Sequence, residues 1–313
     1  MADSTASVQS VQSVLWVLVG DAALAFEAAG VPSPRFDAEE LMAWAVGTRR
    51  SALRTVDRLD DDAVSRFRAA ARRRESREPL QHITGTAAFR YVELAVGPGV
   101  FVPRPETEVV AGRAIELAAA VVAQGRTPLV VDLCTGSGAI AVAVAGEVPT
   151  ASVHAVELGE SALVWAGRNI EGTGVVLHAG AAATALPELE GTVDVVVSNP
   201  PYVPADGLIR DPEVLVHDPG LALWGSGADG LDVVRAVARR AQALLRPGGW
   251  FVVEHADLQG AAVLASLHEQ GGWTDVADHV DLAGRDRFAV ARKSMVDPYG
   301  QQEQQEQGST GAR

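Results

Sequence analysis

The residue types best suited to chemistry lie in Ser198-Asn199-Pro200-Pro201-Tyr202, which follows an apolar, β-branched run at 193–197. Consecutive prolines hold the backbone extended and remove two N–H donors, leaving carbonyl groups that point outward. The side-chain oxygen of Asn199 and the carbonyl of Pro200 then make two acceptors for an –NH₂ group. The Tyr202 ring can stack on a planar amide or base. This stretch therefore predicts a site for a planar nitrogen nucleophile whose lone pair is delocalised.

A second motif, Asp132-Leu133-Cys134-Thr135-Gly136-Ser137-Gly138, predicts a ligand-binding turn between a strand and a helix. Its glycines let the backbone approach a ligand closely, and the helix start offers free amides. Glu157 ends the next predicted strand, 19 residues after Gly138, where an acid commonly binds ribose hydroxyls. The third glycine of the dinucleotide-binding fingerprint is missing, which argues against a dinucleotide ligand. No lysine follows the second glycine, which excludes a phosphate-binding P-loop. The motif favours an adenosine-type ligand without a pyrophosphate, and a purely structural turn is the alternative.

Both motifs need a sheet that brings them together. The periodicity after Pro105 predicts helices at 106–123, 139–146, 161–169 and 231–245 and strands at 129–133, 152–157, 193–198 and 250–254. This alternation predicts an α/β fold with a doubly wound, mostly parallel sheet covered on both faces. Ligands bind beyond the carboxyl ends of such strands, so both motifs are expected at one crevice.

The chain before position 79 has a different pattern. Apolar residues at helical spacing and a break at Gly30-Val31-Pro32 predict a small all-helical domain, with a third helix at about 61–76 and no strand up to Ser76. Arginines outnumber acidic residues between Arg49 and Arg77. This excess indicates either a solvated helix face or a surface that binds an acidic partner or ribosomal RNA. Residues 79–102 predict a β-hairpin that links two domains.

Composition narrows the function classes. The charge of 26 − 40 = −14 repels phosphate backbones, so stable nucleic-acid binding is not expected. The single cysteine excludes an internal disulfide framework and a multi-cysteine metal site, and we expect no metal. No segment reads as a membrane span or a secretory signal, which predicts a cytoplasmic protein. The Gln-rich end is expected to be disordered.

With the glycine motif at 132–138 preceding the Ser198–Tyr202 motif in the chain, the two motifs resemble those of class I S-adenosyl-L-methionine-dependent methyltransferases. Glu78–Gly85 and Phe101–Glu108, with 219–223, 227–232 and 281–287, are similar to the HemK/PrmC-type protein-(glutamine-N5) methyltransferases. The resemblance runs from the helical start to about Arg292. It implies methylation of the glutamine in the Gly-Gly-Gln loop of a peptide-chain release factor, a protein of translation termination.

The resemblance also implies domains and roles. Residues 1–78 would recognise the substrate, 79–102 would form the linker, 103–293 the methyltransferase domain and 294–313 a disordered tail. The implied cofactor-binding residues are Phe101, Pro103, Asp132, Cys134, Thr135, Gly136, Ser137, Gly138, Glu157 and Asn199. The implied substrate-binding residues are Asn199, Pro200, Pro201 and Tyr202, of which Asn199, Pro200 and Tyr202 would be catalytic. Arg104 and Glu106 would brace the hairpin.

Two positions depart from the family's pattern. Cys134 stands where the family usually has glycine, and we expect a structural thiol there, not a nucleophile. The stretch Val176–Ala183, with Ala181 and Ala182, lacks the acid that usually meets the adenine. Two alternatives stay open: an adenine-N6 or cytosine-N4 nucleic-acid methyltransferase, and a non-catalytic binding module with the same fold.

Overall fold

The computed structural model describes residues 2–207 and 211–295, and the chain divides into two units. The first unit comprises Met1–Thr86, Val96–Pro98 and Ile209–His217. The second comprises Ala87–Ala95, Gly99–Leu208 and Asp218–Arg313. The predicted disordered tail lies outside the described residues from position 296 onward.

The first unit is helical, as the sequence predicts. Its elements are α1 (Ala2–Ala28), α2 (Pro34–Val46), the 3-10 helix η1 (Arg50–Thr55), α3 (Asp61–Glu75), α4 (Leu80–Thr84) and α8 (Pro212–His217). The Asp60 side chain begins α3 by accepting a hydrogen bond from the Ala63 amide at 2.7 Å. Arginines in the last turn of α3 complement its dipole. Within residues 2–76 no strand occurs, which confirms that prediction.

Helix α1 supplies much of the core of this unit. Its residues Leu15, Val19 and Phe26 are fully buried and belong to one apolar cluster with Phe67 of α3. Within the described residues, the segment Val11–Ala28 is long and apolar enough to cross a membrane by length and composition. The buried stripe gives this apolar helix a partner inside the protein itself.

The predicted hairpin is present but shorter than expected. It consists of β1 (Thr86–Phe89) and β2 (Val92–Ala95), joined through Arg90, whose φ is +51°. Residues 80–84, which we assigned to the hairpin, form α4 instead. Asn169 ties the second strand to the rest of its unit, since its side chain bonds both the amide and the carbonyl of Ala95 at 2.7 and 2.9 Å.

The second unit contains a seven-stranded sheet of order β5-β4-β3-β6-β7-β9-β8. The strands are β3 (Leu129–Leu133), β4 (Ser152–Glu157), β5 (Val176–Ala179), β6 (Val193–Ser198), β7 (Leu245–Glu254), β8 (Trp273–Val280) and β9 (Asp286–Lys293). Strands β5, β4, β3, β6 and β7 pair in parallel, and β9 pairs antiparallel with β7 and β8. The predicted doubly wound, mostly parallel sheet is confirmed.

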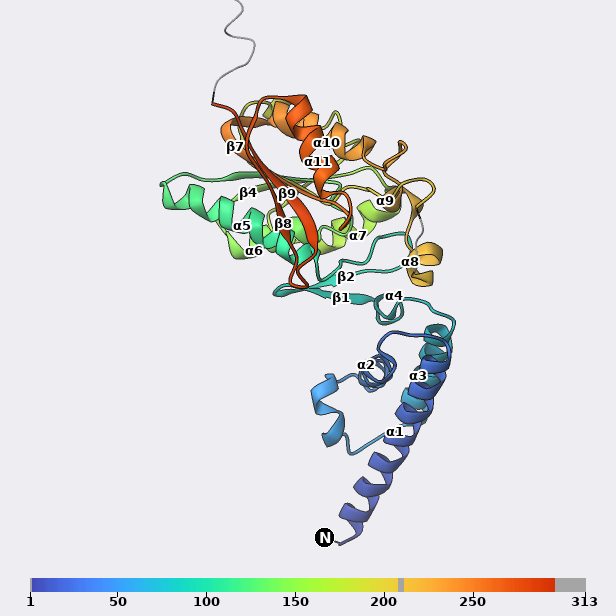
Figure 1. Cartoon of the computed structure of the whole chain (residues 1–313). Coiled ribbons are helices and arrows are strands. Elements are labelled where there is room, and N and C mark those ends of the chain that lie inside the picture. Colours follow the sequence, from blue (N-terminus) through green and yellow to red (C-terminus); the bar gives the residue numbers. More distant parts are fainter. Residues whose placement is uncertain (1, 208–210, 296–313) are drawn as a thin grey trace, which may run out of the picture. The chain divides into compact units, whose positions relative to one another are not determined.

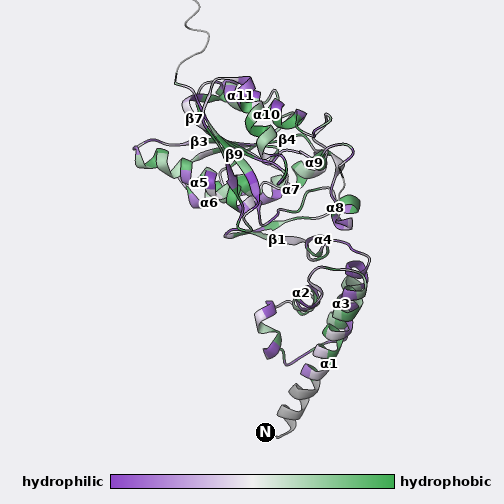
Figure 2. Ribbon diagram, viewed as in Figure 1, coloured by the Kyte–Doolittle hydropathy of each residue, from purple (hydrophilic) through white to green (hydrophobic). Residues whose placement is uncertain are grey.

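Helices cover both faces of this sheet. They are α5 (Thr107–Ala123), α6 (Ala139–Glu147), α7 (Glu160–Ile170), α10 (Asp232–Leu244) and α11 (Gly260–Gln270), with the short η2 (Pro187–Leu189) and α9 (Gly220–Leu223). Figure 1 shows α10 and α11 on one face and α5 and α6 on the other. Hydrophobic colour marks α5 and α10 in Figure 2, because each packs an apolar face on the strands.

The strand order places the chemically interesting residues along one edge. Strands β4, β3, β6 and β7 are consecutive neighbours and run parallel, so their carboxyl ends meet. Glu157 ends β4, Cys134 follows β3, Asn199 follows β6 and Glu254 ends β7. This edge is where parallel sheets bind ligands.

The sequence did not predict α8, α9, α11 or the antiparallel pair β8 and β9. Strand β8 is mostly exposed or half-buried and carries polar residues on both faces. A half-buried strand is recognised by strict alternation of apolar and polar residues, and β8 lacks that alternation.

Candidate active site

The turn after β3 depends on left-handed backbone at alternate residues. The φ angle is +62° at Cys134, +59° at Gly136 and +86° at Gly138. Glycine adopts a positive φ without steric cost, whereas a residue with a Cβ, such as Cys134, adopts it only at a cost. The Thr135 amide donates to the Val156 carbonyl at 2.9 Å and holds the turn against β4. A Cβ added to Gly136 would meet no atom within 4 Å, so the turn faces open space.

Asp132 lies beneath this turn and braces it. The side chain is fully buried and accepts from the Thr135 hydroxyl at 2.5 Å and from the Ala141 amide at 3.2 Å. Burial raises the pKa of Asp132 to about 7, although these hydrogen bonds oppose the rise. The side chain therefore fixes the shape of the turn from below.

Glu157, the predicted ribose-binding acid, is oriented by backbone amides. Its Oε2 accepts from the Gly136 amide at 2.8 Å, and its Oε1 accepts from Leu158 at 2.9 Å and Gly159 at 2.7 Å. One of these donors belongs to the glycine turn itself. The carboxylate at the end of β4 and the turn after β3 are thus joined into one structure.

The Cys134 thiol has the character of a structural group. Burial raises its pKa to about 12, and the nearby Glu157 and Asp132 carboxylates add to the rise. The thiolate is the nucleophilic form of cysteine. Because this thiol stays protonated at neutral pH, the geometry supports the expectation that Cys134 does not act as a nucleophile.

Asn199 is half-buried just beyond β6, and its carboxamide is anchored on one side. Its Nδ2 donates to the Thr107 hydroxyl at 3.2 Å. Thr107 is the first residue of α5 and is 4% exposed. With Nδ2 engaged in this way, the carboxamide oxygen of Asn199 stays available as an acceptor.

Tyr202 is also held by a buried acid. Its hydroxyl donates to Oε1 of Glu254 at 3.2 Å. Glu254 is 1% exposed, and burial raises its pKa to about 7, a rise that Thr107, Arg287 and Tyr202 oppose. Burial, followed by the charge of Glu254, raises the pKa of Tyr202 well above its usual value. Tyr202 is therefore a neutral hydrogen-bond donor.

The backbone after the proline pair is locked by two contacts. The Gln259 side chain donates to the carbonyl of Tyr202 at 2.8 Å and to that of Asp229 at 2.9 Å. Gly230 approaches so closely that an added Cβ would lie 2.5 Å from the Tyr202 carbonyl oxygen. A side chain at Gly230 would displace the motif, so this site needs glycine there.

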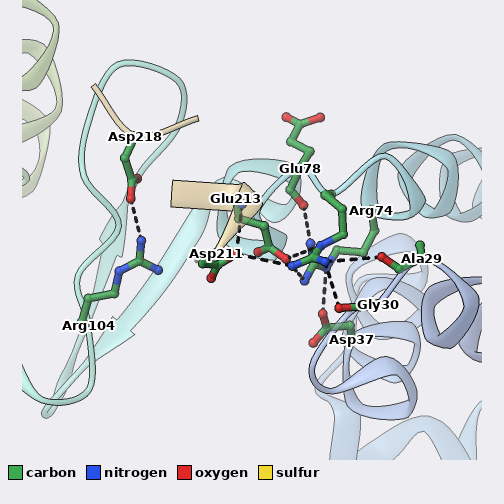
Figure 3. A network of polar contacts seen from close by, with 10 residues as sticks. Ala29, Gly30, Asp37, Arg74, Glu78, Arg104, Asp211, Glu213 and Asp218 are labelled. Atoms are coloured by element: carbon green, nitrogen blue, oxygen red, sulfur yellow. Dashed lines mark hydrogen bonds and ion pairs between the residues drawn. The ribbon is translucent and has the colours of Figure 1, made fainter. Parts of the chain in front are cut away.

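Phe101 and Arg104 precede α5 and contact each other. The guanidinium carbon of Arg104 lies 4.8 Å from the centre of the Phe101 ring. Its Nη2 donates to Oδ2 of Asp218 at 2.6 Å, and Figure 3 shows this second contact. We expected Arg104 to brace the hairpin. The structure shows it paired with Asp218 instead, because a buried carboxylate needs a charged donor.

The remaining predicted residues lie in the turn after β3, in the segment after β6 and in the segment before α5. Ser137 is buried, and its carbonyl accepts from the Asn169 side chain at 2.9 Å. Pro200 is buried, whereas Pro103 and Pro201 are half-buried. The predicted site residues therefore lie at the ends of three strands, β3, β4 and β6, and on the segment before α5.

The sequence analysis did not single out Thr107, Glu254, Gln259 or Asn169. Glu254 ends a strand that was predicted at 250–254. Applying the rule for strand ends to that strand would have identified it. The other three act through distant contacts that leave no local pattern in the sequence.

These donors and acceptors fit a nucleoside that carries an amino-acid tail. A carboxylate at the end of β4 suits two ribose hydroxyls, and the open glycine turn suits a chain that passes close to the backbone. Among the described residues, no group of three or more His, Cys, Asp or Glu side chains is placed to hold a metal ion.

Two family models and several known proteins match this chain. Residues 18–85 match the family described as PrmC N-terminal domain, and residues 98–211 match the methyltransferase small domain. A release factor glutamine methyltransferase of Streptomyces coelicolor is 58% identical over 268 residues, 85% of this chain and 94% of that protein. One of Mycolicibacterium smegmatis is 47% identical over 270 residues, 85% of this chain and 93% of that protein.

A relative whose name gives a different activity also matches. The 4-amino-L-phenylalanine/4-methylamino-L-phenylalanine methyltransferase of Streptomyces pristinaespiralis is 48% identical over 210 residues, 67% of this chain and 72% of that protein. The two relatives with higher coverage share the name release factor glutamine methyltransferase. The chain is an enzyme that uses S-adenosylmethionine, and it belongs to the release factor glutamine methyltransferase family.

Proposed function

We propose that this chain transfers the methyl group of S-adenosylmethionine to the side-chain amide nitrogen of a glutamine in a peptide-chain release factor. The orientation of Asn199 carries the proposal. Its Nδ2 is engaged by Thr107, so its oxygen remains as an acceptor one strand away from the glycine turn. An acceptor at that place suits the –NH₂ group of a carboxamide.

In this reaction the amide nitrogen forms a bond to the methyl carbon, the bond from that carbon to sulfur breaks with release of S-adenosylhomocysteine, and one amide proton passes to solvent. The mechanism therefore depends on positioning more than on a strong base. Bound S-adenosylmethionine supplies a methyl group that its positively charged sulfur already activates. Asn199 and the Pro200 carbonyl would accept the two amide hydrogens and turn the nitrogen lone pair toward that methyl group. The same oxygens would stabilise positive charge as it develops on the nitrogen.

The other predicted residues would bind either the cofactor S-adenosylmethionine or the substrate glutamine. The Cys134–Gly138 turn would hold the amino-acid part of the cofactor, and Glu157 would bind its ribose. Phe101 and Pro103 would line the pocket, and Tyr202 would contact the substrate amide. The firm backbone support of the turn and of Glu157 favours this assignment.

The names of two relatives support a conjugated nitrogen as the methyl acceptor. One name specifies a glutamine and another an amino group on the phenylalanine ring. In both, the nitrogen is planar because its lone pair is conjugated. We favour the protein substrate, since the helical unit matches a family of its own and carries exposed arginines such as Arg54, Arg68 and Arg72 that suit an acidic partner. We place this reaction in the cytoplasm.

The test is a methyl-transfer assay on the full chain with Asn199→Ala. We expect kcat toward release factor to fall about 100-fold or more, the size found for removing one polar group that stabilises a transition state. The affinity for S-adenosylmethionine, measured by calorimetry, should stay within about threefold, because in this proposal the Cys134–Gly138 turn and Glu157 would hold most of the cofactor. Near-normal turnover by the variant would exclude this mechanism.

The acceptor is tested with the unmodified chain. Release factor, 4-amino-L-phenylalanine, DNA and ribosomal RNA are compared, and methylated residues are located by mass spectrometry. Methylation of the release-factor glutamine alone supports the proposal. A preference for a nucleic acid or the free amino acid would replace the substrate, and failure to bind S-adenosylmethionine would indicate a binding module.

A further inference from the structure

The two acceptors proposed for the substrate amide lie on a short backbone stretch between two anchored residues. Before them, the Ser198 hydroxyl donates to the Leu133 carbonyl at 2.6 Å and ties the motif to β3. After them, the Tyr202 carbonyl accepts from the Gln259 side chain at 2.8 Å. The direction of the Pro200 carbonyl therefore depends on how firmly this second anchor holds.

Little backbone freedom separates the Pro200 carbonyl from the Tyr202 carbonyl. Pro201 lies between them, and its ring fixes φ at about −65°. A proline also restricts the residue before it to extended backbone. The two carbonyls are thus coupled through few rotatable bonds, and a shift of about 1 Å in a group that positions a substrate can cost about 100-fold in rate.

The Gln259 amide is held in one orientation by three backbone groups. Its Nε2 donates to the carbonyls of Tyr202 and Asp229 at 2.8 and 2.9 Å. Its Oε1 accepts from the Ala256 amide at 3.1 Å. A carbonyl only accepts and a backbone N–H only donates, so a flipped Gln259 amide would lose all three bonds. Gln259 therefore joins the segment after β6 to the segments after β7 and before α10.

The loop that carries Gln259 is itself anchored at its base. The backbone N–H of the fully buried His255 donates to the Arg287 carbonyl of β9 at 2.9 Å. Its Nε2 lies 3.0 Å from Oδ1 of Asp278 on β8. The backbone N–H of Gln259 donates to the Ala256 carbonyl at 2.9 Å and closes the loop. The antiparallel pair β8 and β9 thus supports the loop from which Gln259 reaches the motif.

We infer that Gln259 is a positioning residue for methyl transfer. Through the Tyr202 carbonyl, it keeps the Pro200 carbonyl directed at the substrate amide. The inference rests on the proposed function, because it assumes that Pro200 and Asn199 accept the amide hydrogens. Because the glycine turn and Glu157 are held by separate contacts, loss of the Gln259 amide should lower kcat and leave cofactor binding unchanged.

The first test is Gln259→Met in the full chain, which removes the donor at nearly constant size. We expect kcat toward release factor to fall about tenfold, the loss expected for one hydrogen bond, while Kd for S-adenosylmethionine stays within about threefold. Gln270→Met is the matched control, because Gln270 ends the same helix α11 and donates to the Ala238 carbonyl at 3.3 Å. Its kcat should stay within about twofold. Circular dichroism shows whether each variant is folded.

A second variant supplies a pH signature. Gln259→Glu keeps the length of the side chain but sets a carboxylate oxygen against the carbonyls of Tyr202 and Asp229. It should be less active than Gln259→Met at pH 8. Lowering the pH protonates the new carboxyl group, which can then donate one hydrogen bond. The activity of Gln259→Glu relative to wild type should therefore rise between pH 8 and pH 6, whereas that of Gln259→Met should stay constant.

A spectroscopic measurement reports the contact without turnover. In protein labelled with ¹³C at the tyrosine carbonyl, the Tyr202 resonance is the one that disappears in Tyr202→Phe. It should move in Gln259→Met, because the carbonyl loses its donor. The resonance of Tyr91, whose side chain is 85% exposed in the turn of the hairpin, should not move.

The outcomes separate the inference from the proposed function. Wild-type kcat in folded Gln259→Met, a constant relative activity of Gln259→Glu between pH 8 and pH 6, or a parallel loss of S-adenosylmethionine affinity overturns the inference even if Asn199→Ala is inactive. Full activity of Asn199→Ala overturns the proposed function and the inference together. If Gln259→Met does not fold, Gln259→Asn replaces it, since this variant keeps the amide but shortens its reach. Lower kcat with unchanged Kd supports the inference there, and wild-type kcat overturns it.

Discussion

The helical unit and the edge of the sheet treat buried charge in opposite ways. In the helical unit, Arg74 of α3 is 3% exposed. Its guanidinium donates to Asp37 at 2.7 Å, to Glu213 at 2.8 Å and to the Glu78 carbonyl at 2.9 Å, as Figure 3 shows. Each buried acid therefore faces a positive charge.

At the sheet edge, two acids are just as deeply buried without such a partner. Asp132 and Glu254 accept hydrogen bonds from neutral groups, and neither forms an ion pair with a described residue. One oxygen of each lacks a hydrogen-bond partner among the described residues. Burial raises the pKa of both carboxyl groups to about 7.

This difference separates a stabilising network from a functional one. A buried charge whose partner is removed destabilises a fold strongly, so the Arg74 network makes the helical unit depend on every member. Carboxyl groups with raised pKa values cost stability and are concentrated at functional sites. The comparison predicts that mutations of the first network change folding, whereas those of the second change catalysis and pH dependence.

The largest effect should follow removal of Arg74. Arg74→Met leaves the buried Asp37 without its cation, whereas Glu213 keeps Arg77 at 2.9 Å. Burial already raises the pKa of Asp37, and Arg74 opposes that rise. We expect the free energy of unfolding to fall by about 3–5 kcal/mol. Urea unfolding of the full chain, followed by circular dichroism, measures this loss.

Arg73 provides the matched control one residue away. It pairs with Glu78 at 2.5 and 2.8 Å, but its side chain is 45% exposed. Arg73→Met should therefore cost less than about 1 kcal/mol. Equal losses for Arg73→Met and Arg74→Met would show that the buried network has no special role.

The two buried acids of the sheet edge predict that the free energy of unfolding falls as the pH rises. This direction is the opposite of ordinary acid denaturation, in which stability falls as the pH is lowered. Asp132 and Glu254 hold a proton more tightly when folded than when unfolded, with pKa values raised from 3.8 and 4.5 to about 7. Between pH 4 and 7 the unfolded chain releases these protons first, so stability falls as pH rises. Each group should contribute on the order of 2 kcal/mol between pH 5 and pH 8.

Glu254→Gln isolates one of these contributions. The variant should lose less stability than the wild type when the pH is raised from 5 to 8. Free energies of unfolding at both pH values give the difference directly. Two parallel stability curves would contradict the raised pKa of Glu254.

The two regions also differ in how far the sequence could predict them. The glycine turn, Glu157 and Asn199 were identified because each lies at a predicted strand end, where local periodicity and spacing carry the signal. The parallel part of the sheet followed from the same alternation. Strands β8 and β9 were missed because β8 has no clear apolar face.

The supporting contacts could not be predicted from local patterns. Thr107 and Asn199 are 92 residues apart in sequence, and Tyr202 and Glu254 are 52 apart. Arg74 and Glu213 are separated by 139 residues. Such pairs depend on tertiary packing alone, so a buried acid or arginine reveals its partner only in the folded chain.

The smallest effect concerns the backbone of the glycine turn. Cys134 adopts a φ of +62°, which costs a residue with a Cβ about 1 kcal/mol or more. Cys134→Gly and Cys134→Ala both remove the thiol, but only glycine relieves this conformation. Because glycine also loses more entropy on folding, we expect Cys134→Gly to be more stable than Cys134→Ala by only about 0.5–1 kcal/mol. Thermal unfolding compares the two variants, and a more stable alanine variant would show that the turn carries no strain at this residue. If the strain is confirmed, the sheet edge bears a backbone cost in addition to its unpaired acids.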